Sequence, residues 1–390
     1  MGWIVSAGDQ FGIREAAFTM AAALYKMGCK VTIVVLGHGE AAAWFEARRL
    51  ETISVPAADI PFVHRASLMH TARQFLTLRN MEKQCLPLVR TALQAKVFDL
   101  IHFSSQNLIG IAGRLAKERG IPCIWHLANA IGGGYPLSIN KLIYQLQCRA
   151  LGIIPLGNSR FTAQSLGSAL VEPRVLYIGV DSSRFNPERV SPVGRSQLGI
   201  PEKAIVFGLF ARIIPKKGQE IFLKALLSVS DYTSPLHLLL LGGPIEGEFP
   251  AQLRRLAASH GSSDRLHMPG VVADTERYYD IIDIGVNARI DPEPFGLSVI
   301  ESMMMRRPVL VHALGGPAET VIDGVTGWHV PNPSVESFRN GIVRALTDRA
   351  RWREMGEAGR KHALANYTDD VMAGNYLQLV KHSGLITTQS

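Results

Sequence analysis

The segment Ile205-Val-Phe-Gly-Leu-Phe-Ala-Arg-Ile-Ile-Pro-Lys-Lys-Gly218 contains the pattern on which the fold prediction rests. Its first six residues form an uninterrupted apolar run, which is typical of a strand buried on both faces of a parallel sheet. A loop with Pro215 and Gly218 follows, and Gln219–Ser228 then has the pattern of a helix. The segment therefore predicts a strand, a turn and a helix in succession, the repeating unit of an α/β domain.

The same alternation recurs along the whole chain. In the first half, strand-like runs are Ile4–Ser6, Val31–Leu36, Leu100–Phe103, Cys123–His126 and Ile153–Leu156, and helical stretches are Arg14–Met27, Ser67–Gln94, Leu108–Glu118 and Pro136–Ala150. In the second half, strands are expected at Ile205–Phe210, Leu236–Leu241, Ile284–Asn287 and Val309–Val311, and helices at Gln219–Ser228, Pro250–His260, Gly296–Met305 and Glu336–Leu346. Two such series predict two doubly wound α/β domains. Because ligands of such sheets bind beyond the carboxyl ends of the strands, we expect the domains to face a central cleft.

Composition narrows the class of protein. A chain of 390 residues with 47% hydrophobic and 19% charged residues can bury a large core. No apolar run approaches the roughly 18–20 residues of a membrane-spanning helix. The first strand-like run begins at residue 3 with no charged leader before it, so we expect no secretory signal. The four cysteines have no metal-ligand spacing, which favours reduced thiols in a cytoplasmic protein.

The net charge of +8 is concentrated in the first half of the chain. Residues 1–195 hold 21 Lys and Arg against 12 Asp and Glu, whereas residues 196–390 hold 20 against 21. Arg79, Lys83 and Arg90 would share one helical face if the helix continues through Pro87. Such a face can meet an anionic membrane surface or a phosphorylated acceptor, or it can be an ordinary solvated surface. No interleaving of aromatic and basic residues indicates nucleic acid.

The run Asp291-Pro-Glu-Pro-Phe-Gly-Leu-Ser-Val-Ile-Glu301 places two carboxylates around a bend. Glu293 precedes a proline and should lie on an extended loop, and Glu301 should lie in the second turn of a helix after Gly296. Glu301 is surrounded in sequence by apolar residues, where a carboxylate is costly unless it is hydrogen-bonded. Free amides near Leu297 and Ser298 suit a phosphate. The layout suits a sugar–diphosphate–ribose; the alternative is a buried helix with a tolerated or salt-bridged glutamate.

Two cations follow the strand at Ile205–Phe210. Arg212 offers forked donors and Lys217 a point charge, which together suit a diphosphate at the carboxyl end of a strand. The alternative is a solvated basic loop.

Weaker signals lie in the first half. Gly8 and Gly12 flank a strand-to-helix turn where backbone can approach a phosphate, although an ordinary turn explains the same glycines and the spacing is not the dinucleotide fingerprint. His126 ends a strand at the edge where ligands bind, or it is a structural strand-end histidine. No histidine, cysteine or carboxylate cluster has metal-ligand spacing and no Asp-x-Asp motif is present, so we expect no metal and no cofactor.

Taken together, these motifs resemble the GT-B-fold retaining glycosyltransferases of family 4. Glu293 and Glu301 match that family's Glu-x7-Glu signature, and Arg212 with Lys217-Gly218 matches its Gly-Arg-Leu-x-x-x-Lys-Gly pattern. The pieces Gly315–Glu319 and Asp323–Gly327, and the linker from Tyr177 to Pro187, also correspond in order and spacing. The N-terminal loop lacks the family's adjacent glycine pair, and Ile178 replaces the linker asparagine.

The resemblance implies roles for these residues. Glu293 and His126 would lie at the transferred sugar, Glu301 would bond the ribose, and Arg212 and Lys217 would neutralise the leaving diphosphate. Amides at Gly296, Leu297 and Ser298 would help to hold the donor, and the Gly8–Gly12 loop would close toward it. The domains would be residues 1–183 on the acceptor side and 184–366 on the donor side, with a last helix near 367–390 crossing back to the first.

The expected function is metal-independent, retaining transfer of a hexose from a nucleotide-sugar to a hydroxyl of a glycan or lipid-linked acceptor. Family frequency favours a UDP-sugar, with GDP-mannose as the other donor considered. The expected location is the cytoplasm, with peripheral contact at the inner membrane surface. Two rival hypotheses are a catalytically silent nucleotide-sugar-binding subunit and a GT-B sugar-nucleotide epimerase or phosphorylase.

Overall fold

The chain divides into two compact units in a computed structural model. Unit 1 comprises Met1–Gly179 and Asp369–Ser390, and unit 2 comprises Val180–Thr368. The structure describes residues 1–9, 11–57, 68–132, 139–229, 232 and 234–382. The division falls at 179/180 and 368/369 rather than at the predicted 183/184 and 366/367. Val180 and Thr368, the first and last residues of unit 2, form a backbone bridge with each other.

Unit 1 is built on a parallel sheet with strand order β3-β2-β1-β4-β5-β6-β7. Its strands are β1 (Gly2–Ser6), β2 (Thr32–Leu36), β3 (Glu51–Val55), β4 (Ile101–Phe103), β5 (Cys123–Leu127), β6 (Ile153–Gly157) and β7 (Arg174–Val175). The inner strands β1, β2, β4 and β5 are buried at every residue, as their continuous apolar character requires. The strand order reverses between β1 and β4, which is where ligands bind in doubly wound sheets.

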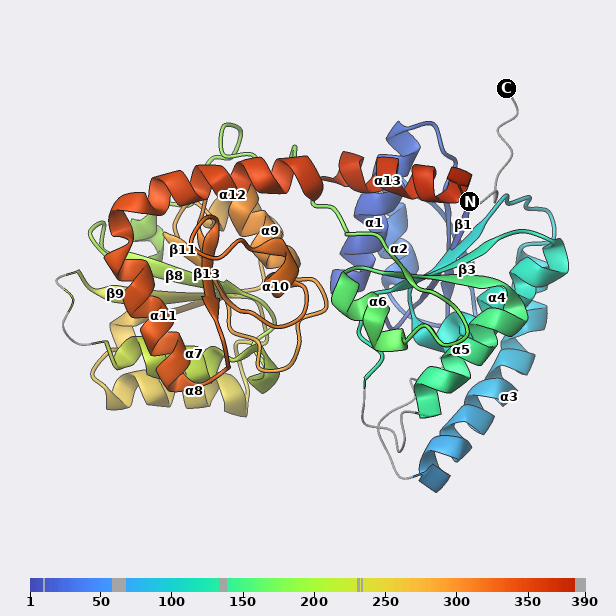
Figure 1. Ribbon diagram of the computed structural model, residues 1–390, viewed down its shortest axis with the longest axis horizontal. Helices are drawn as coiled ribbons and strands as arrows, with labels where there is room; N and C mark the ends of the chain where they lie inside the picture. Colours follow the sequence, from blue (N-terminus) through green and yellow to red (C-terminus); the bar gives the residue numbers. More distant parts are fainter. Residues whose placement is uncertain (10, 58–67, 133–138, 230–231, 233, 383–390) are drawn as a thin grey trace. The chain divides into compact units, whose positions relative to one another are not determined.

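Helices cover both faces of this sheet (Figure 1). On one side lie α1 (Phe11–Lys26), α2 (Ala41–Glu46) and α13 (Asp369–His382), and on the other α3 (Leu68–Ala92), α4 (Ile109–Arg119) and α5 (Ile139–Leu151), with α6 (Arg160–Leu166) after β6. Helix α3 does continue through Pro87. The first residues of the predicted helices 67–94 and 136–150 lie outside the described part of the chain. Helix α13 packs beside α1, so the last helix belongs to unit 1.

Unit 2 is built on a second parallel sheet with strand order β10-β9-β8-β11-β12-β13. Its strands are β8 (Ile205–Phe210), β9 (Leu236–Leu241), β10 (Leu266–Gly270), β11 (Ile284–Asn287), β12 (Val309–His312) and β13 (Gly327–Val330). Helices α7 (Gln219–Leu227), α8 (Glu248–Ser259) and α11 (Val335–Thr347) lie on one face, and α9 (Leu297–Met304) and α12 (Trp352–Asn366) on the other, with the short α10 (Pro317–Thr320) after β12 (Figure 1). Here the strand order reverses between β8 and β11.

The prediction of two doubly wound α/β domains is therefore confirmed. The strands at 205–210, 236–241 and 284–287 have the predicted bounds. The elements that the prediction omitted are α2, β3, α6, β7, β10, α10, β13 and α12. No helix in the described part of the chain is both long enough and apolar enough to cross a lipid bilayer.

Candidate functional site

A buried carboxylate with two cationic partners lies at the switch point of unit 2. Lys217 Nζ donates to Glu293 Oε2 at 2.6 Å, and Arg289 Nη1 donates to Glu293 Oε1 at 2.9 Å. Arg289 also donates to both carboxylate oxygens of Asp291, at 2.5 and 3.1 Å. These four side chains form a continuous line of alternating charge that begins after β8 and continues through the loop after β11.

Gly218 brings the two loops of this site together. Its φ is +75°, and a Cβ at this position would lie 1.9 Å from the carbonyl oxygen of Ala288. Ile290 N–H also donates to Lys216 O at 3.1 Å. The loop after β8 can therefore pack against the loop after β11 only with glycine at residue 218, and this packing sets Lys217 against Glu293.

A second glycine pair supports the backbone of Glu293. Gly315 has φ +80°, and a Cβ there would lie 2.2 Å from Glu293 O. Gly316 N–H donates to that same carbonyl oxygen at 2.8 Å. From sequence, the Gly315–Glu319 piece indicates only a turn; in the structure its glycines give Glu293 a fixed position.

Electrostatics keep Glu293 ionised. Burial alone would raise the pKa of Glu293, but attraction to Lys217 and Arg289, with their hydrogen bonds, lowers it below its ordinary value. Burial, followed by the nearby cations Arg289 and Arg212, lowers the pKa of Lys216. Arg212 itself is exposed. Lys217 and Arg289 pair with Glu293 and Asp291, Lys216 lies close enough to Asp291 to feel its charge, and Arg212 lies near Lys216. The four cations outnumber the two carboxylates, which leaves a net positive charge suited to an anion.

The start of α9 supplies backbone donors. Gly296 precedes the helix with φ +92°, which lets the chain turn sharply from the Glu293 loop into Leu297. Amides in the first turn of a helix, here at Leu297 and Ser298, have no acceptor within the helix and favour a negative charge.

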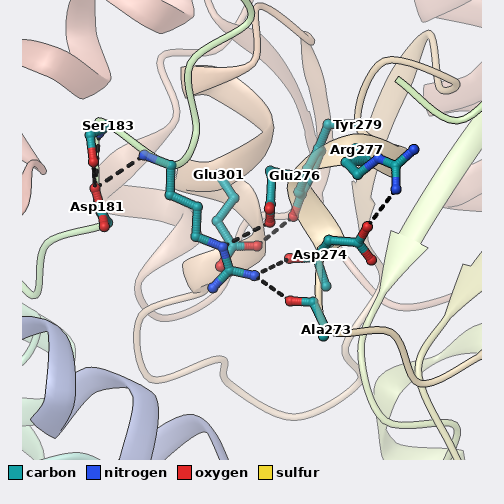
Figure 2. Close-up of polar contacts among 10 residues, drawn as sticks. Asp181, Ser183, Ala273, Asp274, Glu276, Arg277, Tyr279 and Glu301 are labelled. Atoms are coloured by element: carbon teal, nitrogen blue, oxygen red, sulfur yellow. Dashed lines mark hydrogen bonds and ion pairs between the residues drawn. The ribbon is translucent and has the colours of Figure 1, made fainter. Parts of the chain in front are cut away.

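Glu301 has the partner that its apolar surroundings require. Tyr279 Oη donates to Glu301 Oε2 at 2.6 Å, and Figure 2 shows both side chains beside Glu276. Burial, and then the negative charge of Glu301, raise the pKa of Tyr279 well above its usual value. Tyr279 therefore stays protonated and acts as a donor that orients the carboxylate.

Arg184, at the start of unit 2, holds the loop next to this pair. Its Nε donates to Glu276 Oε2 at 2.7 Å, and its Nη2 donates to Ala273 O at 2.8 Å. Glu276 belongs to the short 3-10 helix Thr275–Tyr278, and Tyr279 follows this helix directly as its C-cap residue. The cluster in Figure 2 thus links the chain entering unit 2 to the Glu301 carboxylate.

Unit 1 has a buried carboxylate at its own switch point. Asp9 follows β1, accepts from Ser6 N–H at 3.0 Å and also accepts from the hydroxyl of Ser105, which follows β4. Burial raises the pKa of Asp9, although these hydrogen bonds act in the opposite direction. The space beside Gly8 and Gly12 is open: a Cβ at Gly8 would meet only Ser6 Oγ at 3.9 Å, and one at Gly12 nothing within 4 Å. Packing therefore does not demand either glycine.

His126 lies at the end of β5, buried against His102 with ring centroids 5.7 Å apart. Burial lowers the pKa of His126 to about 4, partly offset by a hydrogen bond with the backbone of Leu176. The ring is therefore neutral near pH 7. Its Nε2 is buried and has no partner among the described residues.

The predicted site residues thus fall into two groups. Arg212, Lys217, Glu293, Gly296, Leu297, Ser298 and Glu301 gather at the carboxyl edge of the unit 2 sheet, and Gly8, Gly12 and His126 belong to the corresponding edge in unit 1. Sequence reasoning missed Arg289, Tyr279 and Asp9. The proximity of Arg289 to Asp291 and Glu293 in sequence was an available signal; nothing local marks Tyr279. Within the described residues, no three His, Cys, Asp or Glu side chains could hold a metal.

Comparison with known families identifies the chain. Residues 191–362 match the model of glycosyl transferases group 1, and residues 11–151 match that of a glycosyl transferase 4-like domain. The two matches span most of the sequence, and the chain belongs to the group 1 glycosyltransferases with the GT-B fold. The predicted family is therefore confirmed.

Several curated relatives act on inositol-containing acceptors, according to their names. A GDP-mannose-dependent alpha-(1-6)-phosphatidylinositol monomannoside mannosyltransferase of Mycobacterium tuberculosis is 30% identical over 52% of this chain, and the match covers 54% of that protein. The chain thus spans about half the length of this relative. A D-inositol 3-phosphate glycosyltransferase of Salinispora arenicola is 26% identical over 81% of the chain and 77% of its own length.

Solved structures share the fold. Anabaena HepE in complex with UDP and glucose has a TM-score of 0.79 at 19% identity, covering 97% of this chain and 98% of its own. A glycosyltransferase from Rickettsia africae has a TM-score of 0.81 at 19% identity, covering 100% and 98%.

Proposed function

We propose that this protein transfers a hexose from a nucleoside diphosphate sugar to a hydroxyl group of a glycan or lipid-linked acceptor. The observation that carries the proposal is the arrangement of Lys217, Arg289 and Glu293 at the switch point of unit 2, beside the start of α9. A buried carboxylate there can accept sugar hydroxyls, because each of its oxygens keeps a free lone pair after bonding one cation. The surrounding cations suit the adjoining diphosphate.

Each side chain has a role in this proposal. Lys217 and Arg212 neutralise the diphosphate as it leaves, with Arg289 as a third cation that also holds Glu293 in place. The first-turn amides at Leu297 and Ser298, with Gly296 before them, bind the phosphates. Glu301 accepts hydroxyls of the ribose, with Tyr279 holding its orientation.

Breaking the bond between the sugar and the phosphate builds negative charge on the diphosphate and positive charge on the sugar ring. Fixed cations and amides stabilise the former without reorganising, and each such donor typically contributes on the order of 10²–10³ in rate. The acceptor hydroxyl attacks the anomeric carbon on the face the diphosphate leaves, so configuration is retained, and its proton passes to a leaving phosphate oxygen. No enzyme nucleophile takes part. His126 acts as a neutral hydrogen-bonding group through its unpaired Nε2.

The donor base is either guanine or uracil. GDP-mannose is favoured by the names of several relatives, whereas UDP occupies the HepE structure, which supports only the fold. The relatives that act on phosphatidylinositol mannosides favour a lipid-linked acceptor and a protein working in the cytoplasm, peripherally at the inner membrane surface.

A thermal-shift panel tests the donor site. Wild type and Glu301→Ala are melted with UDP-glucose, UDP-N-acetylglucosamine and GDP-mannose. We expect sugars of one nucleotide class to raise the melting temperature of the wild type but not that of Glu301→Ala. The class that does so identifies the base. An equal rise in melting temperature in the variant would show that Glu301 does not bind the donor. Release of nucleoside diphosphate only in the presence of an acceptor then distinguishes a transferase from an epimerase or a silent subunit.

Metal independence is tested by chelation. Because the diphosphate is neutralised by Lys217, Arg212 and Arg289 in this proposal, EDTA should leave the rate of nucleotide release unchanged. A loss of rate with EDTA that Mg²⁺ or Mn²⁺ restores would contradict this part of the proposal.

A further inference from the structure

Arg184 bonds three residues of the loop after β10. Its Nε donates to Glu276 Oε2 at 2.7 Å, and its Nη2 donates to Ala273 O at 2.8 Å and to Thr275 Oγ1 at 3.3 Å. The guanidinium group is planar and its N–H donors point in fixed directions, so bonds to three separate acceptors leave little freedom between the arginine and the loop. Arg184 therefore holds residues 273–276 at three points.

The backbone of Arg184 is held in turn by Asp181, the second residue of unit 2. Asp181 Oδ1 accepts from Ser183 N–H at 2.9 Å, from the Ser183 hydroxyl at 2.6 Å and from Arg184 N–H at 3.1 Å. Figure 2 shows the Asp181 and Ser183 side chains lying together. An aspartate that bonds the backbone amides two and three residues further on forms a local turn. The chain entering unit 2 thus determines where the guanidinium group of Arg184 lies.

Tyr279 is coupled to Arg184 by packing as well as through the loop. The centre of the Tyr279 ring lies 4.5 Å from that of Phe210 and 5.9 Å from that of Phe185. The Arg184 guanidinium lies 5.2 Å from the centre of the Phe185 ring. Burial and Glu301 raise the pKa of Tyr279, and the charge of Arg184 acts in the opposite direction, so the arginine is within electrostatic reach of the phenol. Because Tyr279 and Phe185 are buried, a shift of one ring displaces the other.

The hydroxyl of Tyr279 then sets one oxygen of Glu301. It donates to Glu301 Oε2 at 2.6 Å and lies 3.3 Å from the carbonyl oxygen of Ser298. A carboxylate has about four acceptor positions, so Glu301 can bind ribose hydroxyls while Tyr279 holds it. Such binding depends on placing the carboxylate within about 0.5 Å of its working position.

We propose that Arg184 is a positioning residue for the donor ribose. Arg184 fixes the loop after β10 and the Phe185 ring, and both of these set Tyr279. Tyr279 in turn sets the carboxylate of Glu301, so that the chain entering unit 2 governs the preference for ribose over 2′-deoxyribose. This role rests on the proposed function, in which Glu301 binds the ribose, and it adds to that function a residue that itself touches no substrate.

Calorimetric titration of the full chain with nucleoside diphosphates tests this role. The probes are UDP and GDP, each beside its 2′-deoxy form, and the base that binds more tightly is followed. Wild type should bind the ribonucleotide on the order of tenfold more tightly than the 2′-deoxy form, which lacks one hydrogen bond to a charged group. Glu301→Ala should abolish this preference, because the carboxylate that reads the ribose is gone.

Arg184→Gln should lower the preference for ribose to roughly twofold. Binding of the ribonucleotide should weaken about fivefold, whereas binding of the 2′-deoxy form should stay within about twofold of wild type. Tyr279→Phe should have the same effect, and combining the two substitutions should lower the preference no further, because both act on the same carboxylate.

A second arginine of the same loop provides the matched control. Arg277 donates to Asp274 Oδ2 at 2.8 Å and to Ser191 O at 2.9 Å, so it also joins this loop to the chain that precedes β8. Arg277→Gln should keep the wild-type preference for ribose. Arg184→Lys retains the charge but not the forked donors, so its preference should lie between those of wild type and Arg184→Gln. Arg184→Lys also tests the role if Arg184→Gln does not fold.

The variants separate failure of this role from failure of the proposed function. If Glu301→Ala loses the preference for ribose while both Arg184 variants keep it, the role of Arg184 is overturned and the proposed function stands. Equal weakening of both nucleotides in the Arg184 variants would also overturn the role, because the arginine would then support only the fold of the loop. A wild type without the preference, or its retention in Glu301→Ala, would refute the ribose assignment of Glu301 together with the role of Arg184.

Discussion

Glu293 shows how a buried acid stays charged. Its carboxylate is held by Lys217 on one oxygen and Arg289 on the other, so removing either cation leaves a buried charge partly unpaired. Because the pKa of Glu293 is lower in the folded chain than in the unfolded chain, its ion pairs stabilise the fold at any pH above the ordinary pKa of glutamate. This stabilisation is lost as the pH falls through the pKa of Glu293 in the folded chain.

Lys217→Ala should lower turnover on the order of 10²–10³, because the lysine acts on the leaving diphosphate in the proposed reaction. It should also lower the melting temperature, because Glu293 loses one of its two cationic partners, while the chain still folds. The measurement is kcat for nucleoside diphosphate release alongside a melting curve. Lys203→Ala, at an exposed lysine just before β8, is the control and should behave as wild type. Near-normal turnover in Lys217→Ala would refute the assignment.

His126 should make the fold sensitive to acid. Its pKa is about 4 in the folded chain, against an ordinary histidine value of 6.5, so between these values the unfolded chain binds a proton that the folded chain does not. Stability from this group therefore falls as the pH drops from 7 to 5, by about 2 kcal/mol. Urea unfolding of wild type and His126→Asn, followed by tryptophan fluorescence at both pH values, should show a smaller acid loss in the variant. Identical losses would mean that the ring is not buried in its neutral form.

Among the loops, the turn at Gly315 controls the position of the Glu293 segment. Gly315→Ala should cost about 1–3 kcal/mol for the left-handed backbone, with a further cost because its Cβ would lie 2.2 Å from Glu293 O. We expect both the urea midpoint and the donor thermal shift to fall. Gly194→Ala is the control, because φ at Gly194 is −70° and its Cβ would make only ordinary contacts. A normal donor shift in Gly315→Ala would mean that this turn does not support the site.

The sequence predicted the elements whose pattern is unmistakable. Strands such as β8 and β9 are buried on both faces and read as continuous apolar runs. Strand β3 was missed because it lies at the edge of its sheet, where only Val55 of its five residues is buried. Strand β10 was missed because Pro269 interrupts its pattern, which an edge strand tolerates.

The sequence predicted only those site residues that belong to a recognisable motif. Glu293, Glu301 and Lys217 stand in recognisable spacing, whereas an arginine two and four positions before Asp291 and Glu293 is equally typical of an exposed loop. Tyr279 meets Glu301 only through tertiary packing, since 22 positions separate them. The burial that sets the pKa of His126 likewise depends on β4, through His102.

At the scale of the whole molecule, α13 completes unit 1 although it follows unit 2 in the sequence. Tyr376 Oη lies 3.0 Å from His102 Nδ1, and Lys26 pairs with Asp369 at 3.3 Å. A chain ending at Thr368 should therefore have a destabilised unit 1 and an intact unit 2. Limited proteolysis should cut unit 1 first, and the donor thermal shift should survive. Protection of unit 1 equal to that of the full chain would show that α13 is dispensable.

The bridge between Val180 and Thr368, with Val180 N–H bonded to Tyr367 O at 2.9 Å, has an evolutionary consequence. The two ends of unit 2 lie side by side, so the unit forms a closed insert within the chain. If unit 2 binds the nucleotide-sugar as proposed, recombination at these two points could replace one donor-binding unit with another while unit 1 keeps its own chain path. Donor preference and acceptor preference could then change independently during descent, by exchange of a cassette rather than by accumulation of point mutations.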